Sequence, residues 1–312
     1  MKFYFAPLEG VSGYLLRNSQ HIFFENADKY FTPFITTNQC GKLNTKEVSD
    51  ILPENNEGLC IVPQILSNNA DYFIKTSETI KSYGYDEINL NLGCPSGTVV
   101  SKNRGSGFLS VPDELDRFLD EIFSTSVTKI SIKTRLGKDS PDEFYRIMDI
   151  YNKYPLEELI IHPRIRTDYY KNKPNLEMFS YAMKNSKCPV CYNGDLFTRE
   201  DYVNFTEQFP EVDTVMVGRG VIANPALIGE MKLDEKLDMA KFKEYHDTIF
   251  RAYMDRKIGD KNVLFKMKEL WSYMYKMFPD SAKCLKKVRK TQRAAEYESV
   301  VASIFANAYV SE

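Results

Sequence analysis

Short apolar segments alternate with amphipathic stretches along the first 220 residues of the chain. Eight segments have the length and residue types of β-strands, and each ends in polar or glycine-rich residues. They are residues 3–10, 33–39, 59–66, 87–94, 129–136, 157–164, 188–195 and 213–220. The stretches between them predict helices, for example over residues 14–25, 70–83, 112–123 and 141–154.

Eight strand–helix repeats indicate an α/β fold with a parallel sheet, closed most economically as a (β/α)8 TIM barrel. The structural alternative is a doubly wound open sheet. Such a sheet usually has fewer strands and a GxGxxG fingerprint after the first one, where this chain has APLEGVSG. We therefore predict the barrel, with its active site at the C-terminal ends of the strands.

After Met231 the pattern becomes purely helical. Apolar residues recur there at steps of three and four, which predicts one helix face made of Leu264, Met267, Trp271, Met274 and Phe278. A second helix is predicted over residues 281–293. We predict a barrel domain over 1–235 and a small all-α domain over 236–312, with residues 233–238 as the linker.

The net charge of −2 hides an asymmetry between these two parts. Residues 236–312 contain 16 Lys and Arg against 10 Asp and Glu, a net of +6, which leaves −8 for residues 1–235. The predicted helix over 281–293 has no acidic residue and carries Lys283, Lys286, Lys287, Arg289, Lys290 and Arg293. Its four lysines share one face. A polyanionic partner and a solvated helix surface explain this charge equally well.

Composition indicates an ordinary globular protein, with 43% hydrophobic and 27% charged residues. The N-terminal residues lack the apolar stretch of a signal peptide, and no segment approaches the roughly 20 apolar residues of a membrane span. The 6 cysteines are irregularly spaced and do not suggest a disulfide framework. We expect a cytoplasmic protein with no membrane association.

Hydrogen-bonding and ionisable residues gather at the predicted strand ends, which is hard to explain by packing. They are Pro7, Gln64, Asn91, Cys94, Lys133, Arg135, His162, Arg164, Asn193, Asp195 and Arg219. Lys133 alternates with Ile130 and Ile132, so it should point into the barrel mouth. A lysine is rarely buried without a partner, so a bound anion or an electron-rich ring is favoured over an exposed lysine.

Two glycine-containing loops follow the seventh and eighth strands, at residues 193–195 and 218–220. In barrels these loops frequently form a phosphate site, although ordinary tight turns also use such glycines. His162 is one of 3 histidines, and no set of residues has zinc-like spacing. The CPVC sequence at 188–191 is a single CxxC whose alternation turns its cysteines to opposite faces. We therefore predict no metal.

Cys94 lies in INLNLGCPSG, where the alternating strand stops at Gly93 and Pro95. That position suits a proton donor or acceptor at the barrel mouth better than a core residue. A phosphate site, a lysine near a polar ring and a cysteine together fit flavin mononucleotide (FMN). Composition alone does not choose a flavin over another phosphorylated ligand.

Several motifs, in this order, resemble the FMN-dependent tRNA-dihydrouridine synthases of bacterial type. They are APLEGV (6–11), PQIL (63–66), NLGCP (91–95), KNRGSGFL (102–109), KTRLG (133–137), HPRIRTDYYKNKP (162–174), YNGD (192–195) and MVGRGVIANP (216–225). The likeness covers nearly the whole chain, and the motifs are specific only as a set. Departures from the family pattern are Leu8, Pro163 and Asn172.

The resemblance implies that Cys94 is the catalytic proton donor. It implies an FMN site made of Pro7, Leu8, Glu9, Gln64, Lys133, His162, Asn193, Gly194, Asp195, Gly218 and Arg219. Contacts to RNA are expected from Asn91, Lys102, Arg135, Arg164 and Arg166, and from the basic residues of 281–293.

The implied reaction reduces the C5=C6 bond of specific tRNA uridines. NADPH reduces the flavin, flavin N5 passes a hydride to C6, and Cys94 protonates C5. The target base would be extruded from the folded tRNA. We expect a monomer with tRNA and NADPH as partners and no obligate protein partner. The alternatives are a dihydroorotate-dehydrogenase-like flavoenzyme acting on a free pyrimidine, a tRNA-binding protein without catalysis, and a non-redox phosphosugar barrel.

Overall fold

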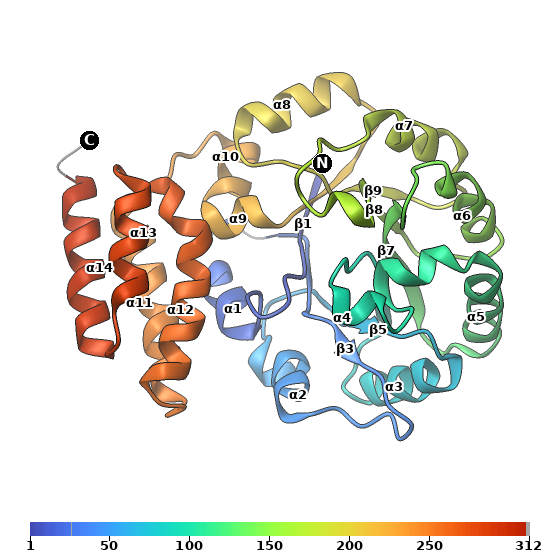
Figure 1. Cartoon of the computed structure of the whole chain (residues 1–312), viewed down its shortest axis with the longest axis horizontal. Helices are drawn as coiled ribbons and strands as arrows, with labels where there is room; N and C mark the ends of the chain where they lie inside the picture. The colour runs from blue at the N-terminus through green and yellow to red at the C-terminus, as the bar shows by residue number, and fades with distance from the viewer. Residues whose placement is uncertain (26, 310–312) are drawn as a thin grey trace. The chain divides into compact units, whose positions relative to one another are not determined.

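The computed structural model describes residues 1–25 and 27–309, and within this part of the chain ten strands form one all-parallel sheet (Figure 1). The strands are β1 (Lys2–Phe5), β2 (Lys29–Phe31), β3 (Ile35–Thr36), β4 (Ile61–Val62), β5 (Gln64–Leu66), β6 (Glu87–Leu92), β7 (Lys129–Gly137), β8 (Leu159–Ile165), β9 (Val190–Tyr192) and β10 (Thr214–Val217). Neighbouring strands pair in the order β3-β5-β6-β7-β8-β9-β10-β1-β2-β4.

This pairing closes the sheet on itself. Strand β2 continues after a short break as β3, and β4 continues as β5. Because β2 pairs with β4 while β3 pairs with β5, the two ends of the sheet belong to adjacent, interrupted strands. The ten segments therefore make eight barrel strands, and the predicted TIM barrel is confirmed.

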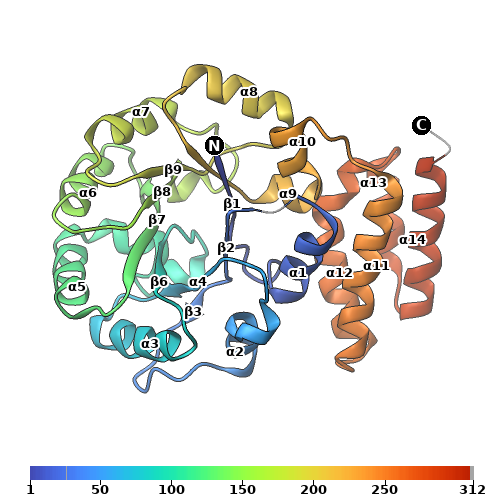
Figure 2. The same ribbon diagram turned by 180° about the vertical axis from the view of Figure 1, so that it is seen from behind.

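Helices surround these strands as the alternation predicts (Figure 2). Those of the barrel are α2 (Thr45–Ile51), α3 (Ala70–Ser82), α4 (Gly97–Val100), α5 (Pro112–Thr125), α6 (Glu143–Tyr151) and α7 (Leu176–Asn185), with short 3-10 turns η1 (Pro53–Asn55), η2 (Gly105–Ser110) and η3 (Arg166–Asp168). Helix α5 illustrates why these segments form helices. Proline and two acids occupy its first turn, and it buries one face made of Leu115, Phe118, Leu119 and Ile122.

The second barrel strand is the main error of the sequence prediction. It was expected over residues 33–39, whereas the structure begins it at Lys29 and interrupts it between Phe31 and Ile35. Pro33 lies in the interruption, and proline cannot donate a hydrogen bond to a sheet. The strand therefore lies on both sides of that residue.

The chain forms two compact units. The first comprises residues 1–7, 28–195 and 209–217, and the second comprises residues 8–27, 196–208 and 218–312. Helices of the second unit are α1 (Tyr14–Phe23), α8 (Arg199–Gln208), α9 (Arg219–Ala223), α10 (Leu227–Leu233), α11 (Met239–Asp255), α12 (Asp260–Met274), α13 (Ser281–Lys290) and α14 (Ala294–Tyr309), with the 3-10 turn η4 (Tyr275–Met277). The functional division at residues 235 and 236 stays a prediction.

Two helix ends in this second unit differ from the prediction. Phe278 is buried but lies beyond α12, in an extended conformation before Pro279, which disfavours a helical residue at that point. Helix α13 ends at Lys290, three residues earlier than expected, where Thr291 turns away in an extended conformation.

Among the described residues, no helix is both long and apolar enough to cross a membrane.

Candidate active site

Cys94 lies two residues after β6, half-buried, in a loop whose backbone is held by hydrogen bonds. The Asn91 side-chain oxygen accepts from the amides of Gly93 and Cys94, both at 3.0 Å. The Ser106 hydroxyl and amide donate to the Cys94 carbonyl at 2.8 and 3.1 Å. Gly105 has φ +55°, and a Cβ there would lie 2.8 Å from that same carbonyl, so only glycine allows this approach.

A row of buried side-chain amides, made of Asn89, Gln64 and Asn91, supports this loop. The Ser131 hydroxyl accepts from Asn89 at 3.0 Å, and the Asn89 oxygen accepts from Gln64 at 2.7 Å. The Gln64 oxygen in turn accepts from Asn91 at 2.7 Å. Both ends of the Gln64 amide are thus engaged, and the residue is fully buried. In this structure Gln64 orients Asn91; its contact with a flavin stays a prediction.

Lys133 lies next to Asn91 across the β6–β7 pair. Desolvation and the nearby Arg135 guanidinium lower the pKa of the Lys133 ammonium to about 8. Within residues 1–25 and 27–309 this half-buried ammonium makes no hydrogen bond or ion pair. An anionic ring edge or phosphate placed against it would stabilise its charge, so the residue fits the predicted cofactor.

Arg135 ties two loops together and is only 1% exposed. Its guanidinium donates to the carbonyls of Gly93 at 3.0 Å, Ile165 at 2.9 Å and Tyr169 at 2.9 Å. The loop after β6, which carries Cys94, is thereby joined to the loop after β8. The sequence predicted an RNA-facing side chain, whereas the structure places this guanidinium inside the protein.

Arg164 is also 1% exposed, and it forms the central ion pair of the β8 end. Its two terminal nitrogens donate to the Asp195 carboxylate at 2.9 and 2.5 Å, and its Nε donates to the Asn172 carbonyl at 2.6 Å. The His162 Nε2 lies 2.9 Å from Arg164, so that nitrogen accepts and the imidazole is neutral. Arg164 therefore organises His162 and Asp195, a role that the sequence prediction missed.

The remaining predicted cofactor residues divide between the two units. Asn193 is buried and donates to the Met216 carbonyl at 2.8 Å, while Pro7 and Gly194 lie half-exposed at strand ends in the same unit. Leu8, Glu9, Gly218 and Arg219 belong to the second unit; Glu9 is exposed and the other three are partly buried.

The loop after β8 presents two exposed tyrosines that the sequence prediction overlooked. Tyr169 is 41% and Tyr170 is 50% exposed, and the Arg166 guanidinium lies 5.7 Å from the Tyr169 ring. Exposed aromatic rings beside arginine are suited to stacking on unpaired bases. The only sign of these tyrosines in the sequence was the YY pair in HPRIRTDYYKNKP. The predicted RNA contact Lys102, on another barrel loop, is also exposed.

The basic residues of α13 and the turn after it are all exposed. They are Lys283, Lys286, Lys287, Arg289, Lys290 and Arg293. Asp280 lies at the start of the helix, 4.0 Å from Lys283. This arrangement preserves a positive surface suited to phosphate contacts.

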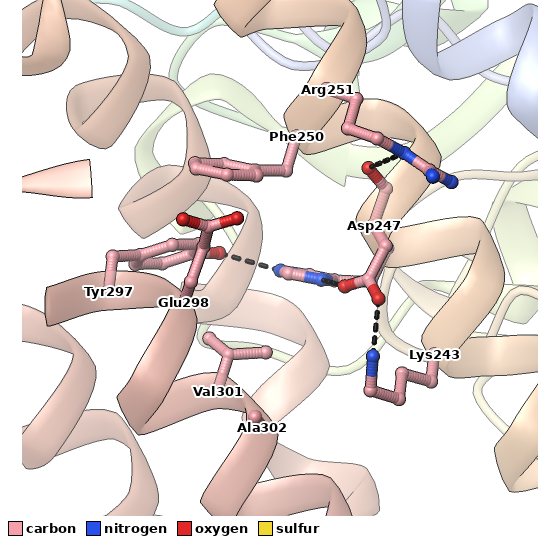
Figure 3. Close-up of a pocket in the computed structure, with 9 residues that line it drawn as sticks. Lys243, Asp247, Phe250, Arg251, Tyr297, Glu298, Val301 and Ala302 are labelled. Carbon is pink, nitrogen blue, oxygen red and sulfur yellow. Dashed lines mark hydrogen bonds and ion pairs between the residues drawn. The ribbon is translucent and has the colours of Figure 1, made fainter. Parts of the chain in front are cut away.

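A second polar cluster lies inside the second unit, beside a pocket between α11 and α14 (Figure 3). Trp271 donates to the Tyr297 hydroxyl at 2.7 Å, Tyr297 bonds to the His246 Nε2 at 2.6 Å, and the His246 Nδ1 bonds to Asp247 at 2.9 Å. Tyr297 is fully buried, and burial raises its pKa well above the usual value. This chain of hydrogen bonds joins α11, α12 and α14.

Among the described residues, no group of three His, Cys, Asp or Glu side chains lies close enough to hold a metal. The ionisable groups described above at the barrel strand ends are the cysteine, the lysine and the arginine–carboxylate pair.

A family model described as dihydrouridine synthase (Dus) matches residues 4–308. A probable tRNA-dihydrouridine synthase of Staphylococcus aureus (strain COL) is 28% identical over 261 residues, covering 80% of this chain and 78% of the relative. The tRNA-dihydrouridine synthase B of Pasteurella multocida (strain Pm70) is 26% identical over 170 residues, covering 54% and 51%.

Solved structures share the fold at low identity. Morphinone reductase in complex with tetrahydroNAD aligns with a TM-score of 0.51 at 13% identity, covering 76% of this chain and 88% of that one. Histamine dehydrogenase from Rhizobium sp. 4-9 aligns with a TM-score of 0.55 at 11% identity, covering 74% and 45%. These likenesses support the barrel architecture.

Proposed function

Because this chain belongs to the dihydrouridine synthase family, we propose that it reduces the C5=C6 bond of uridine in tRNA to give dihydrouridine. As a member of that family it is a flavin-dependent oxidoreductase. The observation that carries the proposal is the placement of Cys94 in a hydrogen-bonded loop, one strand away from the unsatisfied ammonium of Lys133. A proton donor and a cation for an anionic ring are the two groups that such a reduction needs.

FMN is the flavin that we propose, and when bound it would supply the hydride. Lys133 would stabilise negative charge on the reduced ring, and the arginine–carboxylate pair would hold His162 in its neutral form. Cys94 would donate its proton to C5 of the uridine while Asn91 keeps the loop in place. We propose NADPH as the reductant and a monomer as the active species.

The proposed tRNA contacts are those basic residues that the structure leaves exposed. They are Lys102, Arg166, Lys283, Lys286, Lys287, Arg289, Lys290 and Arg293, of which Arg166 is half-exposed. Extrusion of the target base costs on the order of a few kcal/mol, and phosphate contacts from α13 and Arg293 would offset that cost. For Arg135 and Arg164 we propose a positioning role, since their guanidinium groups are buried in protein hydrogen bonds.

The test uses tRNA from a strain that lacks dihydrouridine synthases. Purified protein with FMN and NADPH should form dihydrouridine in that tRNA, and Cys94→Ala should lower the rate by a factor on the order of 10² to 10⁴. Cys40→Ala is the matched control, because Cys40 is exposed on the loop after β3. The Cys40→Ala protein should be fully active. Reduction of free uracil or orotate without reduction of tRNA would refute the proposal, as would a fully active Cys94→Ala protein.

A further inference from the structure

Two segments of the second unit carry four of the proposed flavin contacts. The loop after β1 holds Leu8 and Glu9, and the start of α9 holds Gly218 and Arg219. We infer that two residues position these segments: Lys266 of α12 holds the loop after β1, and Phe197, in the loop between β9 and α8, holds Arg219. This inference rests on the proposed flavin site and assigns these two residues to its support.

The loop after β1 is folded tightly on itself. The Leu8 carbonyl accepts from the amides of Val11 and Ser12 at 3.1 and 3.0 Å, and the Ser12 hydroxyl accepts from the Leu8 amide at 2.7 Å. Arg17, which is fully buried, donates to the Ser12 carbonyl at 2.9 Å. The base of the loop is thus held from within α1.

The tip of the same loop is held from α12. The Lys266 ammonium donates to the Gly10 carbonyl at 2.7 Å. Gly10 has φ +81°, and a Cβ there would lie 3.2 Å from the Glu269 carboxylate, one turn further along α12. Lys266 therefore bonds to the backbone directly after Glu9, and Glu269 lies beside it. A charge-assisted bond at this point restricts where Leu8 and Glu9 lie.

Arg219 is supported by Phe197, which lies in the loop between β9 and α8. Its guanidinium lies 5.1 Å from the centre of the Phe197 ring, and the Lys276 ammonium of η4 lies 5.8 Å from the same ring. Helix α9, which begins at Arg219, packs on both α12 and η4. An arginine over an aromatic face keeps its orientation better than a freely rotating one, which favours a phosphate contact.

The first experiment measures flavin affinity of the full-length protein by fluorescence titration. Lys266→Met should weaken FMN binding about tenfold, and Lys266→Arg should restore it to within about threefold. Lys268→Met is the matched control, because Lys268 lies on the same helix and donates to the Thr291 carbonyl at 2.5 Å. Equal FMN affinity in the Lys266→Met and Lys268→Met proteins would overturn the role of Lys266.

The second experiment compares FMN with riboflavin, which lacks the phosphate. Phe197→Leu should weaken FMN binding about fivefold and leave riboflavin binding unchanged, whereas Phe197→Tyr should keep the preference for FMN. Arg219→Met is measured alongside, because it shows how much of the preference for FMN over riboflavin is lost when the proposed phosphate contact is removed. If Arg219→Met keeps the preference, the proposed flavin site fails. If Arg219→Met loses the preference and Phe197→Leu keeps it, only the inference about Phe197 fails. Should Lys266→Met not fold, Lys266→Gln takes its place in the first experiment, with the same expected loss of FMN affinity.

Discussion

Replacing Asn91 by alanine tests whether the Cys94 loop depends on the buried amide row. The substitution removes the acceptor for two backbone amides, of Gly93 and Cys94, and leaves the Gln64 oxygen without its donor. A buried polar atom without a partner costs about 1–3 kcal/mol. Water can reach the two loop amides, because both residues are half-exposed, so the full cost falls on Gln64. We expect the free energy of unfolding to fall by about 2–3 kcal/mol.

Asn44→Ala is the matched control for this substitution. The Asn44 side chain also accepts from two backbone amides, of Lys46 and Glu47, both at 3.0 Å, but it is exposed at the start of α2. Loss of such a helix cap costs about 1 kcal/mol. Urea denaturation measures both values. Single-turnover reduction of tRNA by the chemically reduced enzyme should slow for Asn91→Ala and stay unchanged for Asn44→Ala.

Equal destabilisation by the two substitutions would refute the reasoning. It would mean that the Gln64 oxygen finds another donor and that the buried amide row does not hold the loop. Loss of turnover without the extra loss of stability would instead indicate that Asn91 acts on the substrate alone, as the resemblance implies.

Three other predictions follow from the titratable groups. Burial lowers the pKa of His246 below 6.5, so the unfolded chain binds the proton more tightly than the folded one. The free energy of unfolding, measured by urea denaturation, should therefore fall as the pH drops from about 7 to 5, and it should fall less in the His246→Gln protein. Because the pKa of Lys133 is lowered from 10.5 to about 8, Lys133→Met without flavin should be more stable at pH 7 by about 3 kcal/mol, a difference that should shrink between pH 8 and 10 in the same assay. Asp195→Asn leaves the buried Arg164 charge uncompensated and should cost about 2–4 kcal/mol in thermal or urea unfolding, against less than about 1 kcal/mol for Asp113→Asn in an exposed pair.

Local pattern was sufficient for most of the barrel. Helix α3 begins at the predicted residue, Ala70, and α5 begins at the predicted Pro112, because caps, prolines and apolar periodicity act within a few residues. The strand around Pro33 was misplaced for a different reason. Its pairing with β4 and β5, rather than its own residues, decides where it begins and ends.

The candidate site was predictable where its residues follow directly from strand ends. Cys94 lies just beyond an alternating strand, and Lys133 lies on the neighbouring strand beside Asn91, three residues before Cys94. The exposed tyrosines of the β8 loop carried too weak a signal, because an aromatic pair in a loop is as compatible with packing as with binding.

By itself, the sequence determined the repeat of strand and helix, the position of Cys94 at a strand end and the positive charge of the C-terminal helices. Only the tertiary structure decided what Arg135 and Arg164 do. The acceptors of Arg135 are backbone carbonyls 30 to 42 residues away, and the carboxylate partner of Arg164 is 31 residues away. A carbonyl has no signature in the sequence, so a buried arginine that holds loops looks the same as an exposed arginine that binds RNA until the chain is folded.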